Sequence, residues 1–191
     1  MAKTLSSMMP LGTMAPAFRL FNPALKKYQT LDQLKSKTGT VVMFICNHCP
    51  FVKLIKSTLA EVARVYQKKG INFIAIASND VSRFPEDSPE RMVEEVKLFN
   101  YPFVYLYDET QAVAKAYQAA CTPDFYLFDD QLSCVYRGQF DEARPGNNII
   151  PTGGDLIKAM ENLMNQRMIS PDQKPSLGCN IKWKEPSEAV L

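Results

Sequence analysis

The sequence has no apolar stretch approaching the roughly 20 residues of a membrane-spanning helix, and its first twenty residues contain no unbroken apolar run of signal-peptide length. It also lacks a stripe of lysine and arginine, because 22 basic and 20 acidic residues are spread along the chain to a net charge of +2. We therefore expect no membrane and no nucleic-acid partner, and we predict a cytoplasmic protein.

Internal repeats, low-complexity tracts and breaks in composition are also missing. With 191 residues, 46% of them hydrophobic, the chain is long enough to bury one ordinary core. We predict a single domain over residues 1–191, in which the proline- and lysine-rich residues 170–191 form an arm packed on the domain surface. The apolar residues of this arm are Leu177, Cys179, Ile181 and Trp183.

Histidine is nearly absent, with His48 alone, whereas cysteine is present in an odd number. The five cysteines are Cys46, Cys49, Cys121, Cys134 and Cys179. Persistent structural disulfides are uncommon in a reducing compartment, so we expect some of these thiols to react.

The clearest structural pattern is a strand, a helix and a second strand. Residues 41–45 and 71–77 are short apolar runs of β-forming residues, typical of strands covered on both faces. Residues between them repeat at helical spacing and form one apolar face: Phe51, Leu54, Ile55, Leu59, Val62, Ala63 and Tyr66. A βαβ unit of this length predicts parallel pairing of the two strands.

The remaining elements complete an α/β pattern. Ser88 and Pro89 are a good N-cap and first-turn proline for a helix to about residue 99. We further predict a strand at 104–107, a helix at 110–119, two strands at 124–129 and 132–137 joined by a tight turn, and a closing helix at 155–167. The expected architecture is a three-layer sandwich with a mixed central sheet and helices on both faces.

Cys49 lies just past the first core strand, with Pro50 where the helix begins. The unpaired N–H groups at a helix N-terminus favour a thiolate and lower a cysteine pKa. The alternative is that Cys49 is a small buried hydrophobic residue. A sulfur sealed in hydrocarbon would contradict the redox interpretation.

Several segments resemble the peroxiredoxin-like proteins of the alkyl hydroperoxide reductase and thiol-specific antioxidant group, within the thioredoxin superfamily. They are GTMAPAFRL, VVMFICNHCPFVK, CTPDFYLFD, YRGQFDEARPGN and KPSLGCNIKW, and they extend over nearly the whole chain. The resemblance implies a thioredoxin-like fold and thiol redox chemistry.

The resemblance also implies roles for particular residues. Aligned on the first core strand, Cys49 falls on the nucleophile, and Cys46 falls where peroxiredoxins place a threonine that bonds the reactive sulfur. Thr122 and Pro123 match the cis-proline motif, whose preceding backbone pairs with an extended partner chain. Pro123 also replaces the arginine by which peroxiredoxins polarise peroxide, which argues against a peroxidase.

Each other thiol has two interpretations. Cys46 is either redox-active, since it can come within disulfide distance of Cys49, or a packed strand residue. Cys121 is either a second thiol beside the cleft or a buried turn residue. Cys179 matches the C-terminal resolving cysteine of some peroxiredoxins, but docking of the arm suffices to explain it, and we prefer that interpretation. Cys134 is expected in the core.

Two basic side chains complete the candidate site. His48 is expected to stabilise a thiolate or move protons near neutral pH, or else to be an exposed loop residue. Arg144 supplies positive charge to the cleft or forms a surface salt bridge.

The leading hypothesis is a thiol–disulfide oxidoreductase in which a Cys49 thiolate attacks a disulfide and Cys46 or Cys121 resolves the product. One alternative is a thiol peroxidase, and another is a copper or zinc site made by Cys46, His48, Cys49 and Cys121. The expected partners are protein or small-molecule thiols and disulfides, or peroxide, with no cofactor and a monomeric or homodimeric chain.

Overall fold

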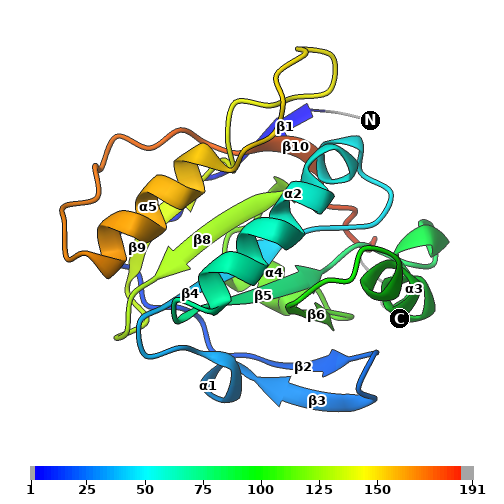
Figure 1. Cartoon of the computed structure of the whole chain (residues 1–191). Coiled ribbons are helices and arrows are strands. Elements are labelled where there is room, and N and C mark those ends of the chain that lie inside the picture. The colour runs from blue at the N-terminus through cyan, green and yellow to red at the C-terminus, as the bar shows by residue number, and fades with distance from the viewer. Residues whose placement is uncertain (1–2, 186–191) are drawn as a thin grey trace.

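The structure is a computed structural model, and it describes residues 3–185. A seven-stranded mixed sheet forms its centre, and a second sheet of three strands lies beside one end of it (Figure 1). In spatial order the large sheet is β3-β2-β6-β5-β4-β8-β9 and the small sheet is β1-β10-β7. The predicted α/β sandwich with a mixed sheet is confirmed.

The strands of the large sheet are β2 (Arg19–Asn22), β3 (Lys27–Thr30), β4 (Gly39–Phe44), β5 (Ile71–Ala77), β6 (Val104–Tyr107), β8 (Asp124–Phe128) and β9 (Cys134–Gly138). Those of the small sheet are β1 (Lys3–Leu5), β7 (Cys121–Thr122) and β10 (Leu177–Asn180). The helices are α1 (Leu31–Leu34), α2 (Pro50–Gln67), α3 (Pro89–Leu98), α4 (Ala112–Ala116) and α5 (Gly154–Met164), with a 3-10 turn at Pro85–Asp87.

The unit β4-α2-β5 confirms the predicted βαβ pattern, and its two strands pair in parallel. Six of the seven residues predicted to form the apolar face of α2 are buried, and they pack the helix onto the sheet. The one misplaced residue is Leu54, which is 36% exposed. The central sheet therefore fixes the direction from which α2 begins, and with it the position of Cys49.

Alternate residues of β4 point to the two faces of the sheet, as the strand period requires. Val41 and Met43 belong to the core cluster that contains α2 and α5, whereas Val42 and Phe44 belong to the cluster that contains α1 and α4. In Figure 1, α2 and α5 lie in front of the sheet and α4 lies behind it. The three layers follow from this alternation.

Several boundaries differ from the sequence-based ones. The predicted tight turn after β8 is present but lies one residue later, because the backbone N–H of Leu132 donates to the Asp129 carbonyl oxygen at 3.1 Å, and a bulge at Leu127 and Phe128 precedes it. Asp129 holds this turn by accepting hydrogen bonds from the backbone N–H groups of Gln131 and Ser133. The helix expected at 110–119 is shorter, as is the closing helix.

The ends of the chain contribute strands that the sequence did not predict. Near the N-terminus, β2 and β3 form a hairpin that adds two antiparallel strands to the large sheet. The C-terminal arm forms β10, which lies between β1 and β7 and pairs antiparallel with both. Residues 186–191 of the predicted arm lie outside the described residues.

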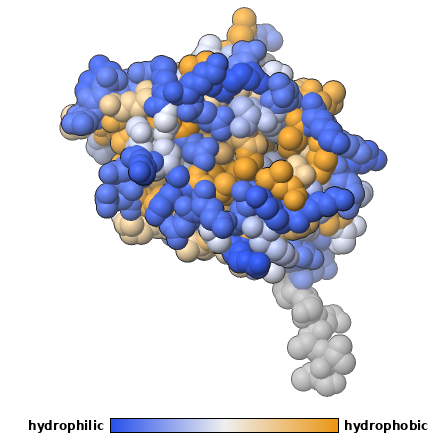
Figure 2. Space-filling view, turned by 60° about the horizontal axis from the view of Figure 1, so that its bottom comes forward, coloured by the Kyte–Doolittle hydropathy of each residue, from blue (hydrophilic) through white to orange (hydrophobic). Residues whose placement is uncertain are grey.

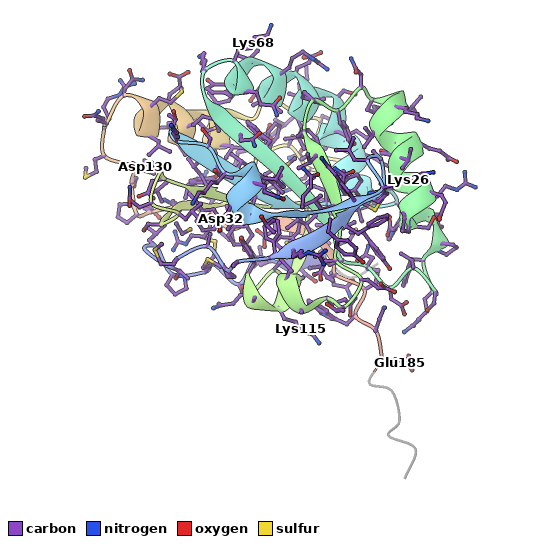
Figure 3. The ribbon with its side chains drawn as sticks, turned by 90° about the horizontal axis from the view of Figure 1, so that it is seen from below. Lys26, Asp32, Lys68, Lys115, Asp130 and Glu185 are labelled. Atoms are coloured by element: carbon purple, nitrogen blue, oxygen red, sulfur yellow. The ribbon has the colours of Figure 1, made fainter. Side chains whose placement is uncertain are left out.

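The surface carries its charges around the whole molecule. Figure 3 labels Lys26, Lys68, Lys115 and Asp130 near the outline, on different sides of the fold. Figure 2 shows the face of the β2–β3 hairpin, where hydrophilic side chains interrupt the apolar ones. Among residues 3–185, no helix is both long and apolar enough to cross a bilayer.

Candidate active site

Cys49 is the N-cap of α2, and Pro50 is the first residue of the helix, as predicted. The side chain of Cys49 is 0% exposed, so solvent does not reach the sulfur in this conformation. This burial agrees with the alternative interpretation of Cys49 as a buried residue, but the contacts of its sulfur do not. Cys49 borders the core cluster of α2, but its sulfur contacts polar groups as well as hydrocarbon.

Hydrogen bonds around the sulfur favour its anion. The largest effect is a side-chain hydrogen bond from Cys46, which outweighs the opposing effect of burial. Three further hydrogen bonds act in the same direction: two from Cys179, by its thiol and its backbone N–H, and one from the backbone N–H of Val52. Together with Cys46 they lower the pKa of Cys49 to about 5. The Val52 N–H is one of the helix-start donors that have no partner within the helix.

One neighbour favours the protonated form instead. The carbonyl oxygen of Thr122 lies 3.1 Å from the Cys49 sulfur, where it accepts a hydrogen bond from a thiol. A carbonyl cannot donate, so it disfavours the thiolate. Because the donors outnumber this single acceptor, the surroundings of Cys49 favour the anion.

Cys46 supplies the strongest of these hydrogen bonds from the loop between β4 and α2. It is buried, and its sulfur lies 3.4 Å from the Thr122 hydroxyl. Its hydrogen bond to Cys49 and its burial raise the pKa of Cys46 well above the usual value. Cys46 is thus a protonated donor to a Cys49 thiolate, in the place where the resemblance implies a threonine hydroxyl.

Cys179 also donates a hydrogen bond to the Cys49 sulfur, although the sequence interpretation preferred a packing role for Cys179. The strand β10 pairs with β7 in a register that sets Cys179 across from Thr122. Burial and the hydrogen bond to Cys49 raise the pKa of Cys179 to about 12. Its contact with Cys49 is the part of the site that sequence reasoning missed.

The two other thiols lie apart from this contact. Cys121 is buried in β7, its thiol lies 3.7 Å from the Pro123 carbonyl oxygen, and burial raises its pKa. Cys134 is buried in the core on the other face of the sheet, as expected, and burial raises its pKa to about 12. The Thr122–Pro123 peptide bond is cis, as the resemblance implies.

His48 is not the exposed loop residue of the alternative interpretation, since its side chain is only 11% exposed. Its Nδ1 lies 2.6 Å from Asp87, and its ring stacks on Phe84 with centroids 5.3 Å apart. The hydrogen bond to Asp87 raises the pKa of His48, and the charge of Cys49 acts in the same direction. In its protonated form the imidazole is attracted to the neighbouring thiolate.

Asp87 accepts hydrogen bonds from the loop before α2, a role that was not predicted from the sequence. Burial raises its pKa, but hydrogen bonds from His48 and Asn79 more than offset this, and the net pKa is lowered. Its oxygens also accept from the backbone N–H of Asn47 at 2.8 Å and from the Asn79 side chain at 2.7 Å. Within the sequence, Asp87 resembles any acidic residue before a helix cap.

Asn79 connects this loop to the C-terminal segment. While its side-chain amide donates to Asp87, its oxygen accepts from the backbone N–H of Lys182 at 2.8 Å. The ammonium of Lys182 lies 5.6 Å from the ring of Phe84, on which His48 stacks. The histidine and the segment that follows β10 thus share one network.

Arg144 makes no ion pair within residues 3–185, so the surface salt bridge is wrong. Its guanidinium donates to the carbonyl oxygens of Asp141 and Ala143 and to the Gln139 side chain. Arg144 and Pro123 line the same small groove beside the start of α2.

A metal site is the last chemical possibility. The structure gathers ligand atoms of Cys46, His48 and Asp87 within 4.8 Å of one another, and it does not bring Cys49 and Cys121 into that group. The alternative set of three cysteines and one histidine considered from the sequence is thus replaced by one cysteine, one histidine and one carboxylate. Within this cluster Asp87 accepts hydrogen bonds from His48 and Asn79, whereas Cys46 contacts Thr122 and Cys49.

The chain is similar to a known protein family and to several solved structures. The sequence model of the AhpC/TSA family matches residues 11–137. A solved structure of an uncharacterized conserved protein from Geobacillus kaustophilus is 52% identical, covering 98% of this chain and 99% of its own with a TM-score of 0.96. The solved structure of the hypothetical protein SMc02350 from Sinorhizobium meliloti 1021 is 46% identical, covering 96% of this chain and 100% of its own with a TM-score of 0.93.

A more distant likeness identifies the fold. The thioredoxin domain of the thiol-disulfide oxidoreductase BVU-2223 from Bacteroides vulgatus is 16% identical, covers 78% of this chain and 97% of its own, and has a TM-score of 0.59. A search of curated proteins found no match. The fold is therefore thioredoxin-like, as the resemblance implied.

Proposed function

The chain belongs to the AhpC/TSA family, and on that basis we propose that it is a thiol–disulfide oxidoreductase in which Cys49 attacks and Cys46 resolves. The family supports a thiol oxidoreductase or peroxidase in general terms. The observation that carries the specific proposal is the pair of hydrogen-bonded thiols at the N-terminus of α2. One of them has a lowered pKa and the other a raised one.

In the first step the Cys49 thiolate attacks one sulfur of a substrate disulfide. A Cys49–substrate disulfide forms, the substrate S–S bond breaks, and the other substrate sulfur leaves as a thiolate. A depressed pKa keeps Cys49 ionised near neutral pH, which is the form that attacks.

In the second step Cys46 attacks the Cys49 sulfur and releases the second substrate thiolate. Once Cys49 is bonded to substrate it is uncharged, so the largest cause of the raised Cys46 pKa is removed. The Thr122 hydroxyl, 3.4 Å away, lowers the Cys46 pKa and remains in place. Two electrons have then passed to the substrate, and an external dithiol reduces the Cys46–Cys49 disulfide.

Cys46 is a better resolving thiol than Cys121, the other candidate. The Cys46 side chain already forms a hydrogen bond with Cys49, whereas the Cys121 thiol donates a hydrogen bond to the carbonyl oxygen of Pro123. Deprotonation of Cys121 is also opposed by burial and by the charge of Asp124.

The test is turnover of a peptide disulfide by single-cysteine variants. We expect Cys49→Ser to abolish turnover, Cys46→Ser to stop after one mixed disulfide that mass spectrometry maps to Cys49, and Cys121→Ser to turn over normally. Unchanged turnover in Cys46→Ser would overturn the resolution step.

Peroxidase activity is the second candidate, because Arg144 lines the groove beside Pro123 and places a guanidinium in the region of the missing arginine. In that case Cys49 would attack the peroxide O–O bond, become a sulfenic acid and release water or an alcohol. Peroxide consumption that depends on both Cys49 and Arg144 would favour this activity.

A further inference from the structure

The C-terminal strand occupies the edge of the sheet next to the nucleophile. Only two residue pairs join β10 to β7: Cys179 with Thr122, and Asn180 with Cys121. In Figure 1, β10 crosses near the start of α2. Because Cys49 is fully buried and contacts Cys179, β10 is one of the segments that separate its sulfur from solvent.

Gly178 allows this strand to pass so closely. A Cβ atom at this position would lie 2.0 Å from the Thr122 carbonyl oxygen and 2.6 Å from its carbon. Both are backbone atoms that cannot move aside as a flexible side chain does. Any side chain before Cys179 would therefore push the strand off β7.

Leu177, the residue before Gly178, has its side chain beside an apolar groove. It lines the small groove together with Phe51, Pro123 and Phe140, which are apolar residues. The segment Leu-Gly-Cys thus places an apolar side chain in the groove, a bare backbone over Thr122 and a thiol on Cys49.

We propose that β10 is a built-in stand-in for substrate: the substrate is a protein disulfide whose extended segment replaces β10 on β7, with its cysteine where Cys179 now lies. The preferred segment has an apolar residue, then glycine, then the cysteine that Cys49 attacks. The substrate proposal rests on the proposed oxidoreductase activity and uses its two-step exchange. Cys49 becomes accessible when β10 leaves β7.

The surroundings of β10 indicate how it is held. After the strand, the backbone N–H of Lys182 donates to the Asn79 side chain, and its carbonyl oxygen accepts from the Gln111 side chain. The backbone N–H of Lys184 donates to the Gln111 side chain at 2.8 Å. Before the strand, the Ser176 hydroxyl donates to the Gly138 carbonyl oxygen. With anchors on both sides and few pairs to β7, β10 can separate from β7 while the arm stays attached.

Two variants loosen β10 without altering the site residues. Gly178→Ala introduces the clashing Cβ, and Gln111→Ala removes the anchor of Lys182 and Lys184, which also serves if Gly178→Ala does not fold. Gly154→Ala is the matched control, because a Cβ there meets only the Thr152 hydroxyl at 3.4 Å. The readout is the rate at which a bulky maleimide modifies Cys49, located by mass spectrometry.

We expect modification to become at least about tenfold faster in a folded loosened variant and to stay unchanged in the control. The wild-type protein should reduce a peptide disulfide containing Leu-Gly-Cys at least about tenfold faster than one containing Leu-Val-Cys. Equal modification rates in wild type and both loosened variants, or equal reduction of both peptides, would overturn the proposal. Faster modification with no reduction of either peptide would instead refute the oxidoreductase activity and leave the covering role of β10 standing.

Discussion

Two regions of the chain donate hydrogen bonds to the Cys49 sulfur, and they differ in how they are connected to Cys49. One is the loop and first turn of α2, which provide Cys46 and the Val52 N–H and are continuous with the nucleophile in sequence. The other is β10, which comes from the far end of the chain and is held on β7 by two residue pairs. The near region keeps Cys49 acidic, and the remote region both adds to that acidity and covers the sulfur.

The acidity of the Cys49 thiol and the access of solvent to its sulfur are therefore separate properties of this site. Removal of the near donors changes the charge of the sulfur without uncovering it. Displacement of β10 uncovers it and also removes the Cys179 donors, so an opened site is more accessible but less acidic.

The largest expected change in the free energy of unfolding arises where the two sheets meet, at Asp124. Asp124 of β8 is 0% exposed and accepts a hydrogen bond from Ser6, which follows β1. Burial raises its pKa from 3.8 to about 7. The folded state therefore binds this proton more tightly than the unfolded state, and the associated stability, present below about pH 4, is lost as pH rises through about 7.

At about 1.4 kcal/mol per pKa unit, this loss is on the order of 4 kcal/mol. We expect Asp124→Asn to remove this pH dependence, so that the wild type, measured by chemical denaturation, loses stability relative to the variant by about that amount between pH 4 and 8. A difference that does not change with pH would show that Asp124 titrates normally.

The next largest effect compares the near donor with a distant thiol. Cys46→Ala removes the strongest hydrogen bond to the Cys49 sulfur, so we expect the Cys49 pKa to rise by about one to two units, since a hydrogen bond to a charged group contributes roughly 1.5–3 kcal/mol. The measurement is titration of the Cys49 Cβ carbon-13 shift, which needs no access to the sulfur. Cys134→Ala, in the opposite core, is the control and should leave the midpoint unchanged.

A smaller rise is expected when the remote donor is removed. Cys179→Ala deletes the side-chain donor but keeps the backbone N–H, and burial and Cys46 both outrank Cys179 in their effect on Cys49. The same carbon-13 titration should therefore give a midpoint between those of wild type and Cys46→Ala. A larger shift in Cys179→Ala than in Cys46→Ala would reverse the ranking of the two regions.

The smallest effect lies in the network between the two regions. Asp87→Asn removes the main cause of the raised His48 pKa, so the imidazole should titrate at lower pH. Because His48 is the single histidine, its proton NMR signal can be followed without ambiguity. The pair stabilises the fold below the ordinary histidine pKa and loses that contribution as pH rises through the raised one. An exposed carboxylate change, Asp130→Asn, should leave the titration as it is.

The near region was predictable because its signals are local. Apolar runs gave β4 and β5, helical spacing gave α2, and the order of Cys49 and Pro50 gave the cap. Leu54 fits the same spacing yet is 36% exposed, so spacing alone did not locate every buried residue of the helix.

The remote region was not predictable, since its contacts join residues far apart in the sequence. Nothing in the short segment around Cys179 distinguishes a strand between β1 and β7 from a surface arm. The role of Asp87 depends likewise on Asn79 and His48 coming together after folding. The burial of Cys49 follows from these same long-range contacts.

The central claim is that the start of α2 and its neighbouring donors hold the Cys49 sulfur as an anion. Titration of the wild-type Cys49 Cβ carbon-13 shift tests it most directly. We predict a single midpoint near pH 5. A sulfur that stays protonated above about pH 8, the ordinary range of a cysteine thiol, would contradict the account.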